Sequence, residues 1–183
     1  MIASNSSDAP VRLIDCSEAE HASAILDILN HAIVTSTALY DYVPRPPQAM
    51  EGWFAAKRAG NFPVVGAIDD RGTLLGFASW GTFRAFPAYK YTVEHSVYIH
   101  HAHRGRGLGK LLMLELIRRA RMAEVHVLIG CIDASNEGSI GLHERLGFSR
   151  CGTFSQVGFK FGRWLDAAFY QLQLDTPAQP KDG

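Results

Sequence analysis

The sequence predicts a mixed α/β (α+β) fold, in which one sheet of about six to seven strands carries helices on both faces. Short β-prone runs alternate along the chain with longer apolar stretches of helical period. A glycine-containing turn at residues 70–72 separates two of these runs, as in an antiparallel hairpin. No internal repeat or second composition regime divides the 183 residues, so a single domain is expected.

The first half of the chain predicts a strand, two helices and the hairpin. A strand at residues 11–15 is followed by Ser17 and Glu20, a capping-box pattern that predicts a helix to about residue 32. The segment after this helix, at residues 40–47, is proline-rich and aromatic, which predicts a loop of a kind that often lines sites. The other elements of this half are a helix at 47–58 and hairpin strands at 64–68 and 74–82.

The second half predicts four more strands and two helices. In chain order, we expect a strand at 92–99, a helix at 108–122, a strand at 125–132, a helix at 137–146, and strands at 148–156 and 164–174. The ends are polar, so we expect disordered tails at 1–9 and 176–183 around a domain at 10–175.

Charge and cysteine usage limit the functional classes. The 18 basic and 18 acidic residues cancel, which argues against nucleic acid or an anionic membrane surface as a partner drawn by the overall field. No apolar run approaches the roughly 18 residues that span a bilayer. The three cysteines are odd in number, widely spaced and preceded by no signal segment, which favours a reduced, cytoplasmic protein.

The most informative segment lies between the strand at 92–99 and the helix at 108–122. This segment runs from Arg104 to Lys110, and every second residue in it is a glycine that follows a basic residue or a leucine. Backbone N–H groups at a helix start lack intrahelical partners and, with the macrodipole, form an anion site. We therefore expect a phosphorylated ligand at residues 105–110, the alternative being a plain basic surface turn.

Two nucleotide-binding templates fail on this loop. A Walker loop needs glycine where Arg104 stands and a hydroxyl residue where Leu111 stands. A dinucleotide fingerprint that starts at Gly105 and Gly107 needs its third glycine at Lys110.

The loop instead resembles the pyrophosphate loop of GNAT-type N-acetyltransferases, whose pattern Q/R-x-x-G-x-G/A is matched by Arg104, Gly107 and Gly109. The resemblance extends over about residues 11–174. Within the family, the chain resembles the phosphinothricin and methionine sulfoximine acetyltransferase branch. It rests on the segments TVEHSVY from residue 92, LHE from 142, LGF from 146 and GFKFGRWLD from 158, and on Asn136 with Ser139.

The resemblance implies a GNAT fold with splayed strands at the coenzyme site and acetyl-CoA as the acetyl donor, without a metal. It implies that strand backbone holds the pantetheine arm, that the glycine loop holds the phosphates, and that Asn136 contacts the arm, although Asn136 is equally suited to cap a helix. The implied coenzyme residues are Val97, Tyr98, Ile99, Arg104, Gly105, Arg106, Gly107, Leu108, Gly109, Lys110, Asn136 and Ser139.

Two residues are candidates for proton transfer. The resemblance assigns the base role to Glu94, since a carboxylate in a partly dry cleft has a raised pKa; the alternative is a solvated carboxylate at a strand end. His143 stands where many GNAT-type enzymes have a tyrosine that protonates the leaving thiolate. An acid or base role suits imidazole, and a histidine hydrogen-bonded on a helix face is the alternative.

The acceptor is expected to be a small amino acid or analogue. A guanidinium beside aromatic rings suits an amino-acid carboxylate and its side chain, although this stretch is also consistent with a surface crossover. The candidate substrate residues are Arg84, Phe86, Tyr89, Tyr91 and Glu94. The branch commonly forms homodimers, in which residues 161–164 would complete a site or pack in a core.

Neither a metal nor a cysteine nucleophile is expected. His95, His100, His101 and His103 cluster in sequence, but no carboxylate or cysteine joins them at ligand spacing. Cys131 and Cys151 lie in β-prone runs and are expected to be small buried residues, which disfavours an acyl-cysteine intermediate.

The resemblance therefore implies an acetyl-CoA-dependent transferase that acetylates the α-amine of a small L-amino acid or analogue, such as phosphinothricin, methionine sulfoximine or methionine sulfone, by direct transfer. Two alternatives stay open. One is a catalytically silent acyl-CoA sensor, and the other is a protein N-terminal acetyltransferase. The sequence does not distinguish resistance from metabolism, the physiological acceptor or the oligomeric state.

Overall fold

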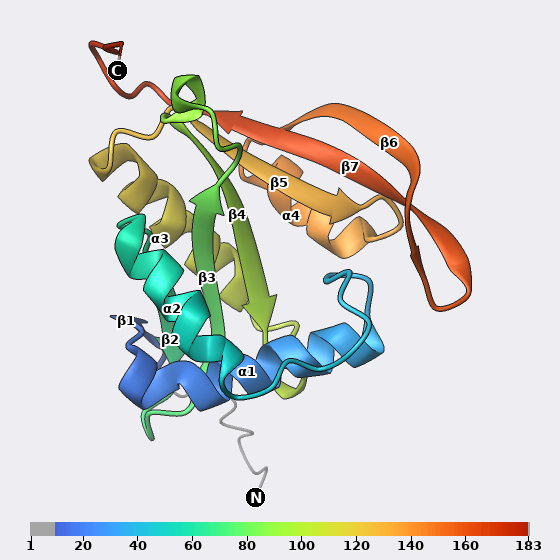
Figure 1. Cartoon of the computed structure of the whole chain (residues 1–183). Coiled ribbons are helices and arrows are strands. Elements are labelled where there is room, and N and C mark those ends of the chain that lie inside the picture. Colours follow the sequence, from blue (N-terminus) through green and yellow to red (C-terminus); the bar gives the residue numbers. More distant parts are fainter. Residues whose placement is uncertain (1–9, 183) are drawn as a thin grey trace, which may run out of the picture.

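The computed structural model describes residues 10–182 and contains one seven-stranded sheet of order β1-β2-β3-β4-β5-β7-β6 (Figure 1). Neighbouring strands are antiparallel except for β4 and β5, which are parallel. The strands are β1 (Arg12–Asp15), β2 (Val64–Ile68), β3 (Leu74–Thr82), β4 (Thr92–Ile99), β5 (Val127–Asp133), β6 (Ser149–Lys160) and β7 (Arg163–Gln173). The helices are α1 (Glu18–Thr35), α2 (Ala49–Ala59), α3 (Leu108–Met122) and α4 (Glu137–Arg145).

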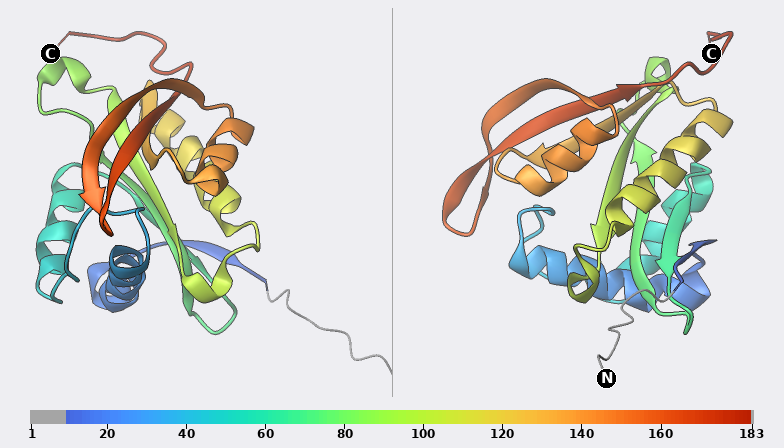
Figure 2. Two further views of the ribbon diagram at one scale, coloured as in Figure 1. Left: turned by 90° about the vertical axis from the view of Figure 1, so that its right-hand side faces the viewer. Right: turned by 180° about the vertical axis from the view of Figure 1, so that it is seen from behind.

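Helices cover both faces of the sheet, as expected. Figure 2 shows α1 and α2 on one face and α3 and α4 on the other. The α3 side is built around Leu112, Met113 and Leu116, which are fully buried against β2 to β5. The α1 and α2 side packs Ile25, Phe54 and other apolar residues against Phe77. The mixed fold with helices on both faces is therefore confirmed.

Helix α1 begins at the expected cap. The side chain of Ser17 accepts a hydrogen bond from the Glu20 amide, and its hydroxyl donates to the Glu20 carboxylate. The reciprocal half of a capping box is replaced, because the Ser17 amide donates to His21 Nδ1 at 3.0 Å. The helix ends at Thr35 rather than near residue 32, and this extra turn carries Ile33 into the core.

Strands β4 and β5 separate soon after they meet. They pair over only three positions, the last of which joins Glu94 to Ile129. Beyond it, β4 continues beside β3 as far as Ile99, and β5 continues beside β7 as far as Asp133. Backbone groups on the facing edges of β4 and β5 are thus left without strand partners, and the sheet is splayed at its centre.

The β6–β7 hairpin projects from the body of the molecule (Figures 1 and 2). Strand β6 reaches Lys160 instead of ending near residue 156, because a bulge between Phe154 and Gly158 lets it continue past Gln156. Lys160 joins the hairpin to the loop after α1, since its ammonium donates to the carbonyls of Ser36 at 3.0 Å and Leu39 at 2.5 Å.

The expected N-terminal tail at residues 1–9 lies outside the described residues. Residues 176–182 carry neither helix nor strand, and Thr176 donates to the Val125 carbonyl. Within residues 10–182, no helix combines the length and the apolar character needed to cross a membrane.

Candidate active site

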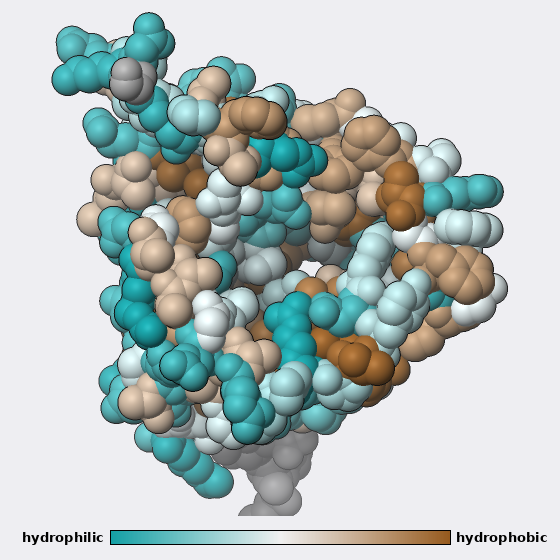
Figure 3. Space-filling model, in the orientation of Figure 1, coloured by the Kyte–Doolittle hydropathy of each residue, from teal (hydrophilic) through white to brown (hydrophobic). Residues whose placement is uncertain are grey.

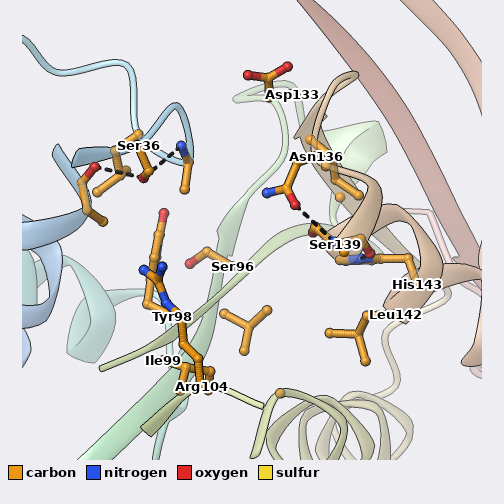
Figure 4. Close-up of a pocket in the computed structure, with 18 of the residues that line it drawn as sticks. Ser36, Ser96, Tyr98, Ile99, Arg104, Asp133, Asn136, Ser139, Leu142 and His143 are labelled. Carbon is orange, nitrogen blue, oxygen red and sulfur yellow. Dashed lines mark hydrogen bonds between the residues drawn. The ribbon is translucent and has the colours of Figure 1, made fainter. Parts of the chain in front are cut away.

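A cavity of about 650 Å³ opens where β4 and β5 separate. Figure 3 shows the surface hollowed between α1 and the β5–β7 region. Its walls come from β4, β5, the start of α3, the start of α4 and the loop that follows α1. In Figure 4, Asn136, Ser139 and His143 form one wall, Ser36 lies on the opposite wall, and Tyr98 and Arg104 lie between them.

The glycine loop forms one end of this cavity. Gly105 and Gly107 have φ values of 77° and 75°, a left-handed conformation that disfavours other residues. A Cβ atom at either position would meet no atom within 4 Å, so open space lies over the backbone. Helix α3 has no side-chain cap at its start. Its first N–H groups therefore stay available for an anion, as the sequence predicted.

The candidate coenzyme residues divide into three groups. Eight of them line the cavity on β4, the glycine loop and the start of α3: Val97, Tyr98, Ile99, Arg104, Gly105, Gly107, Leu108 and Gly109. Arg106 and Lys110 are exposed on the same loop and helix start. Asn136 and Ser139 line the facing wall, where the Asn136 side chain caps α4 by accepting from the Ser139 amide at 3.0 Å. The capping role of Asn136 is thus confirmed.

Glu94 lies at the point where the strands part. Its side chain is half-buried and lines the cavity, so it is not a solvated carboxylate at a strand end. Burial raises the pKa of Glu94, and the nearby Arg84 guanidinium partly opposes this shift. A carboxylate with a raised pKa is a better proton acceptor than an exposed one.

His143 is held by two internal hydrogen bonds. Its Nδ1 lies 2.7 Å from the Ser139 carbonyl, and its Nε2 lies 2.9 Å from Nε2 of the buried His95. A carbonyl can only accept, so His143 Nδ1 carries the proton. In the neutral ring, His143 Nε2 then accepts a hydrogen bond from the Nε2–H group of His95. Burial lowers the pKa of both rings, which keeps them neutral.

This pairing leaves His143 no free ring nitrogen. The histidine lines the cavity, yet an acid or base role at Nε2 requires its bond with His95 to break. The pair also connects β4 to α4 beneath β5, where Gly130 leaves room for the two rings. His143 thus matches the hydrogen-bonded alternative that the sequence left open.

Of the candidate substrate residues, only Glu94 lines the cavity. Arg84 stacks on Phe83 with 4.4 Å between its guanidinium carbon and the ring centroid, and its charge acts on Glu94. Phe86 is 73% exposed on the crossover, and Tyr89 packs edge-on against Phe83. Tyr91 contacts Lys181 near the C-terminus. The structure therefore brings Arg84 toward Glu94 but leaves the three aromatic residues outside the cavity.

The expected burial of two cysteines is wrong. Cys131 and Cys151 are both exposed, because Cys131 opens into the cavity and Cys151 lies on β6 at the edge of the sheet. Their β-prone surroundings predicted strands correctly but not which face each thiol occupies. Although the residue is exposed to the cavity, the protein around the thiol partly desolvates it. This desolvation and the charge of Glu94 raise the pKa of Cys131 to about 11, so the thiol stays protonated at neutral pH.

The histidine cluster divides in two. His95 is buried against His143, whereas His100 and His101 stack with a centroid distance of 4.3 Å. His31 of α1 stacks on His101 at 4.0 Å and extends this group beside the glycine loop. Across the part of the chain that the structure describes, no set of three His, Cys, Asp or Glu residues is arranged to hold a metal ion.

Several cavity residues were not among the candidate site residues named from the sequence. They include Ser36, Thr37, Tyr40, Ser96, Asp133 and Leu142. The proline-rich character of residues 40–47 was the one local signal, and Tyr40 lies at the start of that loop. Asp133 carries no such signal, since only the end of β5 and the pairing with β7 bring it to the cavity.

Known proteins resemble this chain over most of its length. The model of the acetyltransferase (GNAT) family matches residues 26–148. The L-methionine sulfoximine/L-methionine sulfone acetyltransferase of Pseudomonas paraeruginosa is 46% identical over 151 residues, which are 82% of this chain and 88% of that protein.

Two solved structures have the same fold. A protein from Acinetobacter baylyi ADP1 has a TM-score of 0.95 and 64% identity, over 97% of this chain and 99% of that chain. The GNAT superfamily phosphinothricin acetyltransferase from Sinorhizobium meliloti, solved in complex with acetyl-CoA, has a TM-score of 0.88 and 34% identity, over 94% and 93%. With its splayed strands, glycine loop and half-buried glutamate, the chain belongs to the GNAT family of acetyltransferases.

Proposed function

We propose that this acetyltransferase transfers the acetyl group of acetyl-CoA to the α-amine of a small L-amino acid analogue, methionine sulfoximine, methionine sulfone or phosphinothricin. The observation that carries the proposal is the separation of β4 from β5 after Glu94 and Ile129. It creates one cavity that runs from an anion site to a half-buried carboxylate. A donor and an acceptor can therefore occupy it together.

The residues present fit acetyl-CoA as the donor. Its diphosphate would lie over Gly105 and Gly107, where the backbone is open and the N–H groups of α3 begin. Arg104, Arg106 and Lys110 add positive charge on the same loop. The unpaired β4 edge at Val97–Ile99 suits the amide groups of the pantetheine arm, and Asn136, Ser139 and Leu108 border its path.

Glu94 would act as the general base. Attack on the thioester needs a neutral amine, and a carboxylate whose pKa is raised by burial can take the ammonium proton directly or through one water. The positive charge of Arg84 opposes part of this rise in the pKa of Glu94 and so favours the ionised carboxylate, which is the form that accepts a proton. Both ring nitrogens of His143 are engaged in hydrogen bonds, so the side chain has no nitrogen free for proton transfer. Its ring would instead form the wall beside the thioester.

Direct transfer within a ternary complex is favoured over an acyl-cysteine intermediate. Cys131 is the thiol in the cavity, and its pKa of about 11 leaves little thiolate at neutral pH. A protonated thiol is a weak nucleophile, so its attack on the thioester carbonyl has no advantage over direct attack by the amine beside Glu94.

We further propose a homodimer formed through the β6–β7 hairpin. Phe154, Phe161 and Trp164 are 60%, 56% and 59% exposed there, and Figure 3 shows apolar surface on that side. Such a group of exposed aromatic residues is typical of an interface. Analytical ultracentrifugation should give a dimer for the native chain and a monomer for Trp164→Glu. The three free thiols favour the reducing cytoplasm as its location.

A thiol-release assay tests the proposed reaction. The purified protein and acetyl-CoA are incubated with methionine sulfoximine, methionine sulfone, phosphinothricin, ordinary amino acids and a short peptide. Free coenzyme thiol should appear with the first three compounds. Release with the peptide alone would indicate a protein N-terminal acetyltransferase. Tight acetyl-CoA binding without release for any acceptor would instead indicate a sensor.

A further inference from the structure

The side chains of β5 divide the cavity into two halves. A Cβ atom on Gly130 would lie 3.0 Å from His95 Cε1, so this position faces the histidine pair and α4. Cys131 and Asp133 alternate with it and face the other side, toward the loop after α1. Glu94 contributes to the raised pKa of Cys131, and Asp133 and Cys131 contribute to that of Tyr40. Glu94, Cys131, Asp133 and Tyr40 therefore border the same half.

Asp133 carries a buried oxygen, Oδ2, that accepts no hydrogen bond from the described residues, although the Arg163 guanidinium forms an ion pair with it. The residue is only 5% exposed. Its Oδ1 accepts from the amide and hydroxyl of Ser135 at 2.9 and 2.8 Å. Its Oδ2 makes no hydrogen bond within residues 10–182, and the nearest cationic group is the Arg163 guanidinium at 3.6 Å. A buried carboxylate oxygen left in this state is costly unless a ligand brings a donor.

The carboxylate is charged and therefore only accepts. Burial opposes ionisation, but the Thr37 hydroxyl, Ser135 and Arg163 together hold the pKa of Asp133 below its ordinary value. An N–H group of a ligand would satisfy Oδ2, whereas an oxygen in the same place would be repelled.

The distance to Glu94 fits the length of the proposed acceptor. The backbone of Asp133 lies four residues beyond Ile129, the strand partner of Glu94, which places the two backbone positions about 13 Å apart along β5. An extended methionine analogue spans roughly 6 Å from its amine to the atoms on sulfur. Two hydrogen bonds of about 3 Å each bring this to roughly 12 Å. The amine can thus reach Glu94 while the side-chain end reaches Asp133.

We propose that Asp133 determines acceptor specificity by accepting a hydrogen bond from an N–H group at the end of the acceptor's side chain. The inference rests on the proposed function and names its preferred acceptor. Methionine sulfoximine carries an N–H on sulfur where methionine sulfone carries a second oxygen, and the two are otherwise of the same shape. The enzyme therefore prefers the sulfoximine.

The test compares kcat/KM for the two acceptors in the native protein and in Asp133→Asn. Asparagine keeps Oδ1 for Ser135 and replaces Oδ2 with an NH₂ donor, which matches the sulfone. The native protein should favour the sulfoximine by about tenfold, which corresponds to one hydrogen bond to a charged group. Asp133→Asn should remove or invert this preference. Ser135→Ala is the matched control, since it disturbs only Oδ1, and it should keep the native ratio.

Each outcome decides the inference. An unchanged ratio in Asp133→Asn would overturn it, and so would a raised KM for acetyl-CoA alone, because Oδ2 would then serve the coenzyme. Should the variant fail to fold, calorimetry on the native protein saturated with CoA gives an independent answer, since equal affinities for the two compounds would contradict the assignment. Turnover of neither compound by the native protein would reject the proposed acceptor class itself, which is a separate result.

Discussion

The substitution Gly130→Ala tests the histidine pair most sharply, because it adds one methyl group and removes no polar atom. The new Cβ would lie 3.0 Å from His95 Cε1 and 3.2 Å from His143 Nε2, closer than carbon normally approaches either atom. Contacts on their other sides oppose a shift of the two rings. Both pack on Phe148, with centroid distances of 5.1 and 5.0 Å, and the Ser139 carbonyl fixes His143 from its other nitrogen.

The expected cost follows from these contacts. Overpacking of a close-packed core typically costs about 1–3 kcal/mol. If the rings move apart and the bond between the two Nε2 atoms is lost, two buried polar atoms are left unsatisfied, which adds about 1–3 kcal/mol. We expect Gly130→Ala to lower the free energy of unfolding by about 2–6 kcal/mol in total.

Urea unfolding measures this loss, and long-range proton–nitrogen NMR reports the protonated nitrogen of each imidazole. The native spectrum should place the His143 proton on Nδ1. Gly152→Ala is the matched control, since it is also a glycine in a strand but has no atom within 4 Å of its new Cβ. It should change stability by at most about 0.5 kcal/mol. Equal midpoints for the two variants, with unchanged imidazole signals, would refute the pairing.

Three further predictions concern stability. Lys160→Met should lower the free energy of unfolding by about 2–4 kcal/mol, because the carbonyls of Ser36 and Leu39 lose their donor; a loss of under about 0.5 kcal/mol in urea titration would contradict the link between hairpin and loop. Burial lowers the pKa of Lys57 from 10.5 to about 8, so the folded protein binds fewer protons than the unfolded chain between these values. Stability should rise with pH across that window, and Lys57→Met should flatten the rise in thermal unfolding; an identical slope would be evidence against the shift. Leu112→Ala removes a fully buried side chain and should cost about 2–5 kcal/mol by calorimetry, with a smaller value showing that α3 can collapse into the gap.

The end of the cavity proposed to bind the donor could be predicted because the residues that form it are close together in sequence. The helix start, the two glycines with positive φ and the preceding strand lie within about twenty consecutive residues, so spacing alone was enough. The order of elements was predicted for the same reason. Element ends were less accurate, as in β6, where a bulge extends the strand to Lys160.

The acceptor half could not be predicted because it depends on long-range pairing. His95 and His143 are 48 residues apart in sequence, and only the fold shows that their Nε2 atoms form a hydrogen bond with each other. Closeness in sequence to Glu94 suggested the aromatic residues of the crossover, but that segment turns outward and leaves Phe86 exposed. The cavity wall there comes instead from Tyr40 and Asp133, on a loop and a strand end that meet only in the folded sheet.

The central claim is that Glu94 removes the proton from the acceptor amine. The most direct measurement is kcat for thiol release by Glu94→Gln across pH at saturating acetyl-CoA and methionine sulfoximine, together with the affinity for acetyl-CoA. Native kcat should rise with pH through an apparent pKa above the 4.5 of an exposed glutamate, because burial raises it. Glu94→Gln should lose this limb and about 10²–10⁴-fold in kcat while binding acetyl-CoA as before. A variant with near-native kcat and the same pH profile would contradict the account.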